Sequence, residues 1–265
     1  MDKSTIAGIV IALGFISAAL MMEGGSLLQV MQPTALMIVL GGTVGAVMIQ
    51  FPLPVVLKAA KRVTAVFIEP KHDLKAVVDE LVKYANQARK EGIVSLDKEL
   101  ANIHEPFMKK ALMLAVDGTE PTELRGMMEV ELDQRTDQDE KIPQVFEAAG
   151  GYAPTVGIIG AVLGLIQVMQ HLDNIEEVGR GIAVAFVATI YGVGFSNLFF
   201  LPAAGKLKIR LHHEHLAHEM TLDGVVSILE GMNPRMLETK LLGYIGDAPT
   251  TTAAAEPEEA KAASA

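Results

Sequence analysis

The sequence predicts an all-α integral membrane protein in which four transmembrane helices carry a helical cytoplasmic domain between the second and third. The first observation is a set of four apolar stretches, each long enough to cross a bilayer, at residues 4–22, 34–51, 152–170 and 182–201. The second is their grouping into two close pairs, which the long and mostly polar segment 52–150 separates. The third is the placement of basic residues beside the stretches, which indicates how the helices cross the membrane.

Loop charge places both termini and the segment 52–150 on the cytoplasmic side. The first loop, residues 23–33, contains no Lys or Arg, and the loop after the third span has Arg180 as its basic residue. Basic residues instead follow the second and fourth spans: Lys58, Lys61, Arg62, Lys71, Lys206, Lys208 and Arg210. Because basic residues near span ends mark the cytoplasmic side, we expect a multi-pass protein with two short loops outside.

These boundaries divide the chain into five segments. We expect transmembrane helices 1 and 2 in residues 1–51, the cytoplasmic helical domain in 52–150, transmembrane helices 3 and 4 in 151–202, cytoplasmic C-terminal helices in 203–246 and a disordered tail in 247–265. The tail is predicted to be disordered because it has no large apolar residues with which to build a core.

Apolar residues at helical spacing predict the helices of the cytoplasmic segment, and Gly92 should break one of them. The expected helices are 55–68, 73–90, 96–103, 106–116 and 122–149, and the last nearly reaches the third span. Pro154 should begin the third span and Pro202 should end the fourth, because proline does not fit a helix interior. Each proline is compatible with simple helix punctuation or with a hinge that couples membrane to cytoplasm.

No acid or base lies deep inside any of the four spans. A protein that moved ions alone would be expected to carry an ionisable group at membrane depth. If the chain is a transport machine, its ion-binding carboxylate should therefore lie on another chain. A threonine hydroxyl in a helix usually bonds the carbonyl four residues earlier, so a structural role is favoured for the polar residues at depth. These are Thr43, Thr155, Thr189, Tyr191, Ser196 and Asn197.

Small residues are frequent in the membrane stretches, at Gly41, Gly45, Gly157, Gly160, Gly164, Gly192 and Gly194. Small residues let helix backbones approach closely in a bilayer. Close packing and a specialised pore face explain this pattern equally well.

Composition argues against several other classes of protein. The absence of cysteine excludes a disulfide framework and a thiolate metal site, and the net charge of −10 disfavours a nucleic-acid partner. No catalytic constellation or accessible phosphate loop is visible, so neither an enzyme nor a cofactor is expected. A passive membrane scaffold without conductance stays as an alternative. A solvated helix face is favoured over a metal site for the four clustered histidines, His212, His213, His215 and His218.

A charged cluster surrounds the break at Gly92. Its members are Arg89, Lys90, Glu91, Asp97, Lys98 and Glu99. Such clusters are usually solvated turns. Groups of opposite sign on either side of a bend are also suited to steering a charged partner.

Several strings resemble the A subunit of flagellar stators, the MotA/PomA family: ARKEGIVSLDKEL at 88–100, YAPTVGIIGAVLGLIQVM at 152–169, AVAFVATIYGVGFSNLFFLP at 183–202 and EGMNPRMLETKLLGYI at 230–245. Together with the order of the spans, the resemblance covers nearly residues 1–245. It implies a channel in the bacterial inner membrane, surrounded by lipid, in which five A subunits surround two helices of a B subunit. An Asp of the B subunit would carry the ion, and ion flow would rotate the A ring.

The resemblance also implies roles for individual residues. The family's two functional prolines fall on Pro154 and Pro202. The cytoplasmic domain would contact the rotor protein FliG through charged residues, which fall on Arg89, Lys90, Asp97 and Glu99. The acid at position 97 is usually Glu in the family, so this chain has the shorter side chain there.

The coupling ion depends on two positions in the expected ion pathway, Ala161 and Thr189. Sodium-driven members of the family carry Thr at the position of Ala161 and a Thr that matches Thr189. A dehydrated sodium ion needs several oxygen ligands, whereas a proton needs only the carboxylate, so Ala161 favours protons. The alternatives are a sodium-driven stator and an energy transducer of the related ExbB/TolQ type, which usually has three spans.

Overall fold

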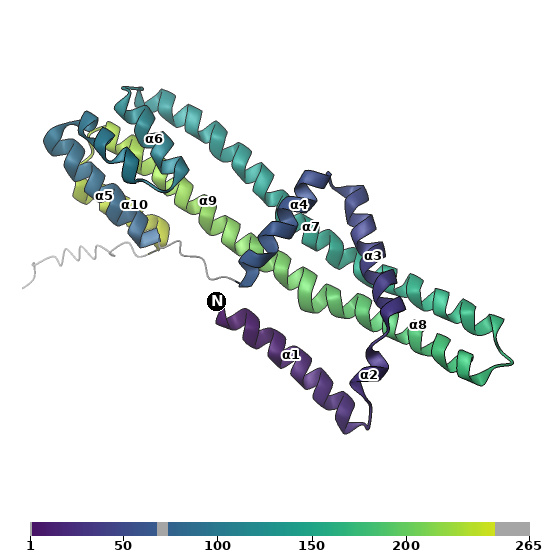
Figure 1. Cartoon of the computed structure of the whole chain (residues 1–265). Coiled ribbons are helices and arrows are strands. Elements are labelled where there is room, and N and C mark those ends of the chain that lie inside the picture. The colour runs from purple at the N-terminus through teal and green to yellow at the C-terminus, as the bar shows by residue number, and fades with distance from the viewer. Residues whose placement is uncertain (1, 68–73, 247–265) are drawn as a thin grey trace, which may run out of the picture. The chain divides into compact units, whose positions relative to one another are not determined.

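The computed structural model describes residues 2–67 and 74–246, and every regular element within them is helical (Figure 1). The predicted all-α fold is confirmed for this part of the chain. The expected tail 247–265, Lys71 and the last residue of the expected helix 55–68 lie outside the described residues. The chain divides into a first unit, residues 1–72 with 130–215, and a second unit, residues 73–129 with 216–265.

Two long helices have residues in both units, α7 (Pro121–Gln170) and α9 (Leu201–Leu229). The first unit also contains α1 (Lys3–Met22), α2 (Leu27–Val30), α3 (Pro33–Gln50), α4 (Leu53–Arg62), the 3₁₀ turn η1 (Val63–Phe67), α8 (Ile175–Phe195) and the π-turn η4 (Ser196–Phe200). The second unit also contains α5 (Leu74–Glu91), the 3₁₀ turns η2 (Ile93–Lys98) and η3 (Leu100–Asn102), α6 (Pro106–Val116) and α10 (Pro234–Ile245).

Helix starts in the first unit follow local capping chemistry. The Asp2 carboxylate accepts hydrogen bonds from the amides of Ser4 and Thr5 and so caps α1. Ser26 forms a capping box with Gln29 at the start of α2, and Asn174 caps α8. Each cap satisfies backbone N–H groups that the first helical turn leaves without a partner.

Within residues 2–67 and 74–246, four helical stretches are long and apolar enough to cross a membrane. They lie within Lys3–Met22, Pro33–Gln50, Pro121–Gln170 and Ile175–Leu229, in agreement with the four predicted spans. None of the α1 residues is buried inside the chain, although α1 is strongly apolar. An apolar helix with no buried face requires lipid or another protein around it.

Apolar side chains of the described residues form clusters that hold the first unit together. In one, Ala35 and Val39 of α3 pack against Val187 and Ala188 of α8. In the other, α4 packs against α7 and α9 through Ala59, Ile142, Val145, Phe146, Ala149, Ala203, Ala204 and Leu207. The second cluster includes Val66 of η1, so the chain after α4 stays packed against α7 and α9.

The second unit has a core of its own. Phe107 and Leu112 of α6, Leu124 of α7 and Leu237 of α10 are completely buried. Leu81 of α5 is also buried, and its side chain packs against the backbone of α9 at Gly224. The predicted helix 106–116 is confirmed as α6, and the predicted helix 73–90 is confirmed as α5 from Leu74 on, since residue 73 lies outside the described residues.

Some predicted helix boundaries are wrong. The expected helix 96–103 is instead two 3₁₀ turns, η2 and η3, and the expected helix 55–68 changes to 3₁₀ geometry after Arg62. Pro154 does not begin a helix, because α7 runs continuously through it. Pro202 does not end a helix either, because α8, η4 and α9 follow one another without a break.

Candidate functional site

Helices α7 and α8 touch backbone to backbone along a series of glycines. A Cβ at Gly157 would lie 2.9 Å from the Ala188 carbonyl oxygen, and one at Gly164 would lie 2.9 Å from that of Gly181. A Cβ at Gly192 would lie 2.6 Å from the carbonyl oxygen of Ala153. These glycines therefore serve close packing. Gly41, Gly45 and Gly194 have no such neighbour.

The two predicted ion-pathway residues lie at the same level of the α7–α8 pair. A Cβ at Gly160, next to Ala161, would lie 2.8 Å from the Cβ of Ala188, next to Thr189. The side chains of Ala161 and Thr189 are both half-buried. The Thr189 hydroxyl donates to the Ala185 carbonyl over 3.3 Å, as a helical threonine commonly does. Its oxygen keeps lone pairs that are able to accept a hydrogen bond or to bind a cation.

The other polar residues at depth have different partners. The Tyr191 hydroxyl donates to the Val30 carbonyl over 2.6 Å and accepts from the Gln32 amide, which ties α8 to the chain before α3. Asn197 donates to the carbonyl four residues earlier. Among the described residues, the completely buried Thr43 hydroxyl has no hydrogen-bond partner.

The Pro154 region of α7 is connected to the π-turn η4. Proline has no N–H, so Pro154 cannot donate to the Gly150 carbonyl, which would be its partner in a regular helix. The buried Ser196 hydroxyl donates to that carbonyl over 2.6 Å. Sequence reasoning noted Ser196 as a polar residue at depth but gave it no partner.

The π-turn explains how a continuous helix includes Pro202. Pro202 is the second residue of α9 and cannot donate to the carbonyl four residues before it. Immediately before it, the Leu201 amide donates to the Ser196 carbonyl, five residues back. This wider turn shifts the hydrogen-bond register where the proline enters, so the helix continues.

The predicted rotor-contact residues lie on both sides of Gly92, whose φ of 84° ends α5. Arg89, Lys90 and Asp97 are exposed. Glu99 is half-buried, and its carboxylate lies 3.2 Å from the Lys83 ammonium group. Glu99 is therefore held within the second unit by Lys83, whereas the side chains of Arg89, Lys90 and Asp97 are accessible to a partner.

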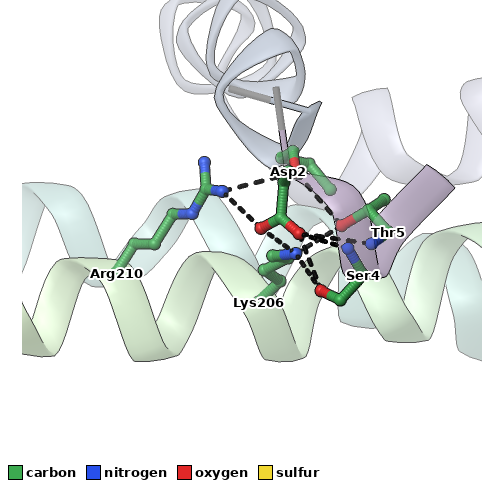
Figure 2. Close-up of polar contacts among 6 residues, drawn as sticks. Asp2, Ser4, Thr5, Lys206 and Arg210 are labelled. Atoms are coloured by element: carbon green, nitrogen blue, oxygen red, sulfur yellow. Dashed lines mark hydrogen bonds and ion pairs between the residues drawn. The ribbon is translucent and has the colours of Figure 1, made fainter. Parts of the chain in front are cut away.

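An ion cluster fixes the start of α1 in the first unit (Figure 2). The Asp2 carboxylate pairs with the Lys206 ammonium group and lies 3.2 Å from the Arg210 guanidinium. Lys206 also donates to the Thr5 hydroxyl, and Arg210 donates to the Val66 carbonyl over 3.4 Å. From the sequence, Lys206 and Arg210 were interpreted only as basic residues that indicate the cytoplasmic side, and their pairing with Asp2 was not predicted. The hydrogen bond from Lys206 is the main reason that the pKa of Asp2 lies far below its usual value.

Two acids organise the second unit. Glu105 caps α6 at the amides of Phe107 and Met108 and lies 3.4 Å from His218. Burial raises the pKa of Glu105, but the hydrogen bonds from His218 and the two amides lower it below its usual value. The other acid, Asp223, lies 2.9 Å from Arg125 and 2.6 Å from Lys240.

The clustered histidines have separate partners. The His215 ring lies 2.8 Å from the Thr136 hydroxyl, whereas the His218 ring pairs with Glu105 and packs on Phe107. In residues 2–67 and 74–246, no group of three or more His, Cys, Asp or Glu side chains could hold a metal ion.

Two family models match most of the chain. The model of the MotA/TolQ/ExbB proton channel family matches residues 99–220, and the model of the motility protein A N-terminal region matches residues 6–92. The spans and the two matches therefore define the class of MotA/TolQ/ExbB channel proteins. The second match covers the first pair of spans.

Relatives define the branch of this class. Motility protein A of Bacillus subtilis is 35% identical over 249 residues, which cover 92% of this chain and 91% of that protein. Chemotaxis protein PomA of Vibrio alginolyticus is 30% identical and covers 93% of this chain and 96% of its own length. The chain belongs to the MotA/PomA family of flagellar stator subunits.

Solved stator complexes have the same fold. The structure of MotAB from C. jejuni matches with a TM-score of 0.87 and 32% sequence identity, over 92% of this chain and 96% of that one. The flagellar MotAB stator complex from Bacillus subtilis matches with a TM-score of 0.84 and 34% identity, again over 92% of this chain and 96% of its own. The chain is thus a flagellar stator subunit that contributes to an ion channel.

Proposed function

We propose that this chain is the A subunit of a proton-driven stator in the bacterial inner membrane, with both termini in the cytoplasm. The observation that carries the proposal is the absence of acidic and basic residues from the depth of all four spans, in a chain that resembles MotAB stators over 92% of its length. The ion-binding carboxylate therefore has to come from a B subunit.

The α7–α8 pair is the part of this chain best suited to face the B subunit. Its backbone contacts at Gly157, Gly164 and Gly192 make it a closely packed pair. Apolar side chains remain exposed along both helices and are available to lipid, to the B subunit and to other copies of this chain. They include Ile158, Ile159, Val162, Leu165, Phe186 and Ile190. These exposed faces support contacts with the B subunit and with other copies of this chain. The arrangement of five copies around two B-subunit helices that we propose follows from the resemblance to the family.

Proton coupling is supported by the side chains at the level of Ala161 and Thr189. Ala161 offers no oxygen, and Thr189 offers one hydroxyl whose proton is already donated to Ala185. Hard cations such as sodium require several oxygen ligands in place of their hydration shell. A proton requires only the carboxylate, so this level of the pathway suits a proton better.

The exposed charges around Gly92 support a contact with the rotor protein FliG. Arg89 and Lys90 follow the last buried turn of α5, and Asp97 projects from η2. Exposed charges of opposite sign favour electrostatic steering of a charged partner. We assign the rotor contact to these three residues, with Glu99 holding η2 against Lys83 on α5.

Swimming speed as a function of external sodium, at fixed pH, tests the proposed coupling ion. Speed should follow the proton motive force, so it should persist in sodium-free medium and collapse when a protonophore is added. The Ala161→Thr variant should not require sodium, because one added hydroxyl does not complete a set of sodium ligands. A saturable rise from zero speed as sodium increases would show a sodium-driven stator instead.

A further inference from the structure

A proline inside a helix creates a defined defect in the backbone hydrogen bonding. Pro154 lies well within α7 and has no N–H, so the Gly150 carbonyl loses its usual donor. Gly150 is buried, and a buried carbonyl without a hydrogen-bond partner destabilises the folded chain. A continuous α7 therefore requires another donor at this carbonyl.

Ser196 supplies that donor from a residue 46 positions away in the sequence. Its hydroxyl lies 2.6 Å from the Gly150 oxygen, and its side chain is only 2% exposed. Most helical serines bond a carbonyl of their own helix, as Ser227 does with the Asp223 carbonyl. The bond of Ser196 crosses instead from one helix to another, onto the carbonyl that Pro154 leaves free.

Residues within about two turns of Ser196 make two further contacts with α7. Gly150 has no side chain, and a Cβ there would lie 2.6 Å from a methyl group of Leu201. One turn before Ser196, a Cβ at Gly192 would lie 3.2 Å from the Pro154 Cα. Ser196 is also the first residue of the π-turn that precedes Pro202. One hydrogen bond thus connects the defects that the two prolines introduce.

We propose that Ser196 is a positioning residue for this pair of prolines. Its hydroxyl replaces the N–H that Pro154 lacks and joins that point of α7 to the start of the π-turn η4. The functional consequence rests on the proposed stator role: the two proline regions change conformation together as ions pass. The hydrogen-bonding relation between Ser196 and Pro154 does not depend on that role.

A double-mutant cycle on the purified complex with its B subunit tests the relation. In the Ser196→Ala variant the Gly150 carbonyl loses its donor, and the thermal midpoint should fall by about 2–4 °C. In the Pro154→Ala background, the new N–H at position 154 satisfies Gly150, so adding Ser196→Ala should lower the midpoint by less than about 1 °C. Equal losses in both backgrounds would show that Ser196 acts independently of Pro154 and would overturn the proposal.

Two further variants separate positioning from ordinary burial. Ser227→Ala removes an equally buried hydroxyl whose acceptor lies in an uninterrupted part of α9, so its effect should be the same in both backgrounds. Ser196→Cys keeps the size of the side chain but donates weakly, so its midpoint should lie between those of the wild type and Ser196→Ala. A midpoint for Ser196→Cys equal to that of wild type would show that the hydrogen bond is unimportant.

Motility provides a separate measurement. Ser196→Ala should reduce swimming speed while the amount of assembled stator is maintained, and Ser227→Ala should swim normally. Normal swimming by Ser196→Ala, together with a positive stability cycle, would confirm the hydrogen-bonding relation and refute joint movement of the two proline regions.

Discussion

Single side chains at the start of α1 contact residues that are far away in the sequence. Asp2 caps α1 and at the same time pairs with Lys206 and Arg210 of α9. α1 has no buried residues inside the chain, so this ion cluster is a main intramolecular attachment of its N-terminal end. Arg210 is itself buried and also holds the Val66 carbonyl, which extends the attachment to η1.

Asp2→Asn should lower the thermal midpoint of the purified complex, because it removes the charge that Lys206 and Arg210 share. The pKa of Asp2 is lower in the folded chain than its usual value of 3.8. Its contribution to stability is therefore fully present above that value and is lost as the pH falls below it. Between pH 5 and about pH 8, the difference between Asp2→Asn and wild type should stay constant.

Glu23→Gln provides a matched control at the opposite end of α1, where the carboxylate is exposed. It should leave the midpoint unchanged. If both variants lowered the midpoint equally, the effect would come from the general charge of α1 and not from the ion cluster.

Charge reversal at Arg89 should impair swimming while leaving assembly in the membrane intact. An exposed ion pair is worth about 0.2–1 kcal/mol, and reversal converts attraction into repulsion. Engagement of the rotor should therefore weaken by about 2- to 30-fold in the Arg89→Glu variant, and the loss should decrease with added salt. Swimming speed and stator occupancy, recorded in the same cells, measure the two effects.

Lys109→Glu makes the same change of charge at an exposed site on α6. It should swim like wild type. Normal swimming by both Arg89→Glu and Asp97→Lys would mean that the charges around Gly92 form only a solvated turn. Partial rescue of Arg89→Glu by the opposite reversal on the rotor would identify a direct contact.

At the scale of elements, local patterns predicted the helices better than their ends. The spans and the helices 73–90 and 106–116 follow from apolar runs and periodicity, which depend on residues close in the sequence. The interpretation of Pro154 and Pro202 as helix boundaries was wrong because the compensation is tertiary. It depends on Ser196, which is 46 residues from Gly150, and on a π-turn that no short pattern predicts.

In the candidate sites, too, features that depend on local sequence could be predicted, whereas features that depend on tertiary packing could not. The exposed charges Arg89, Lys90 and Asp97 could be placed from the sequence, because Gly92 predicts a break there. The pairing of Glu99 with Lys83 and that of Asp2 with Lys206 could not be predicted. Each depends on how separate elements pack, and nothing in the spacing of these residues identifies the partner.

The break at Gly92 is an element-scale feature that a single substitution tests. Its φ of 84° and ψ of 159° lie in a region that is essentially restricted to glycine. Gly92→Ala should therefore destabilise the second unit by about 1–3 kcal/mol and misplace η2 with Asp97. Thermal unfolding of the purified complex measures the loss.

Gly126→Ala is the matched control, because Gly126 lies inside α7, in its second turn, and a Cβ there meets nothing within 4 Å. It should be neutral or stabilising by about 0.5–1 kcal/mol. A midpoint for Gly92→Ala that equals the midpoint of Gly126→Ala would show that the turn at residue 92 tolerates a side chain.

At the scale of the whole molecule, the chain combines apolar spans that lack any charge at depth with a second unit that presents charges around Gly92. Neither part is a complete channel or a complete motor. The likeness to MotAB complexes supports a B-subunit partner, and family membership makes the chain a flagellar stator subunit. In our proposal, the missing carboxylate belongs to that partner. We therefore propose that conduction requires two different chains.

Proton uptake by vesicles that contain this chain alone, or this chain with its B subunit, tests that claim most directly. Any segment of the B subunit that plugs the channel would be removed. Vesicles with both chains should take up protons when a membrane potential is applied, and uptake should stop when the membrane Asp of the B subunit is replaced by Asn. Vesicles with this chain alone should not conduct, because its spans offer no ionisable group. Robust uptake by this chain alone would contradict the account.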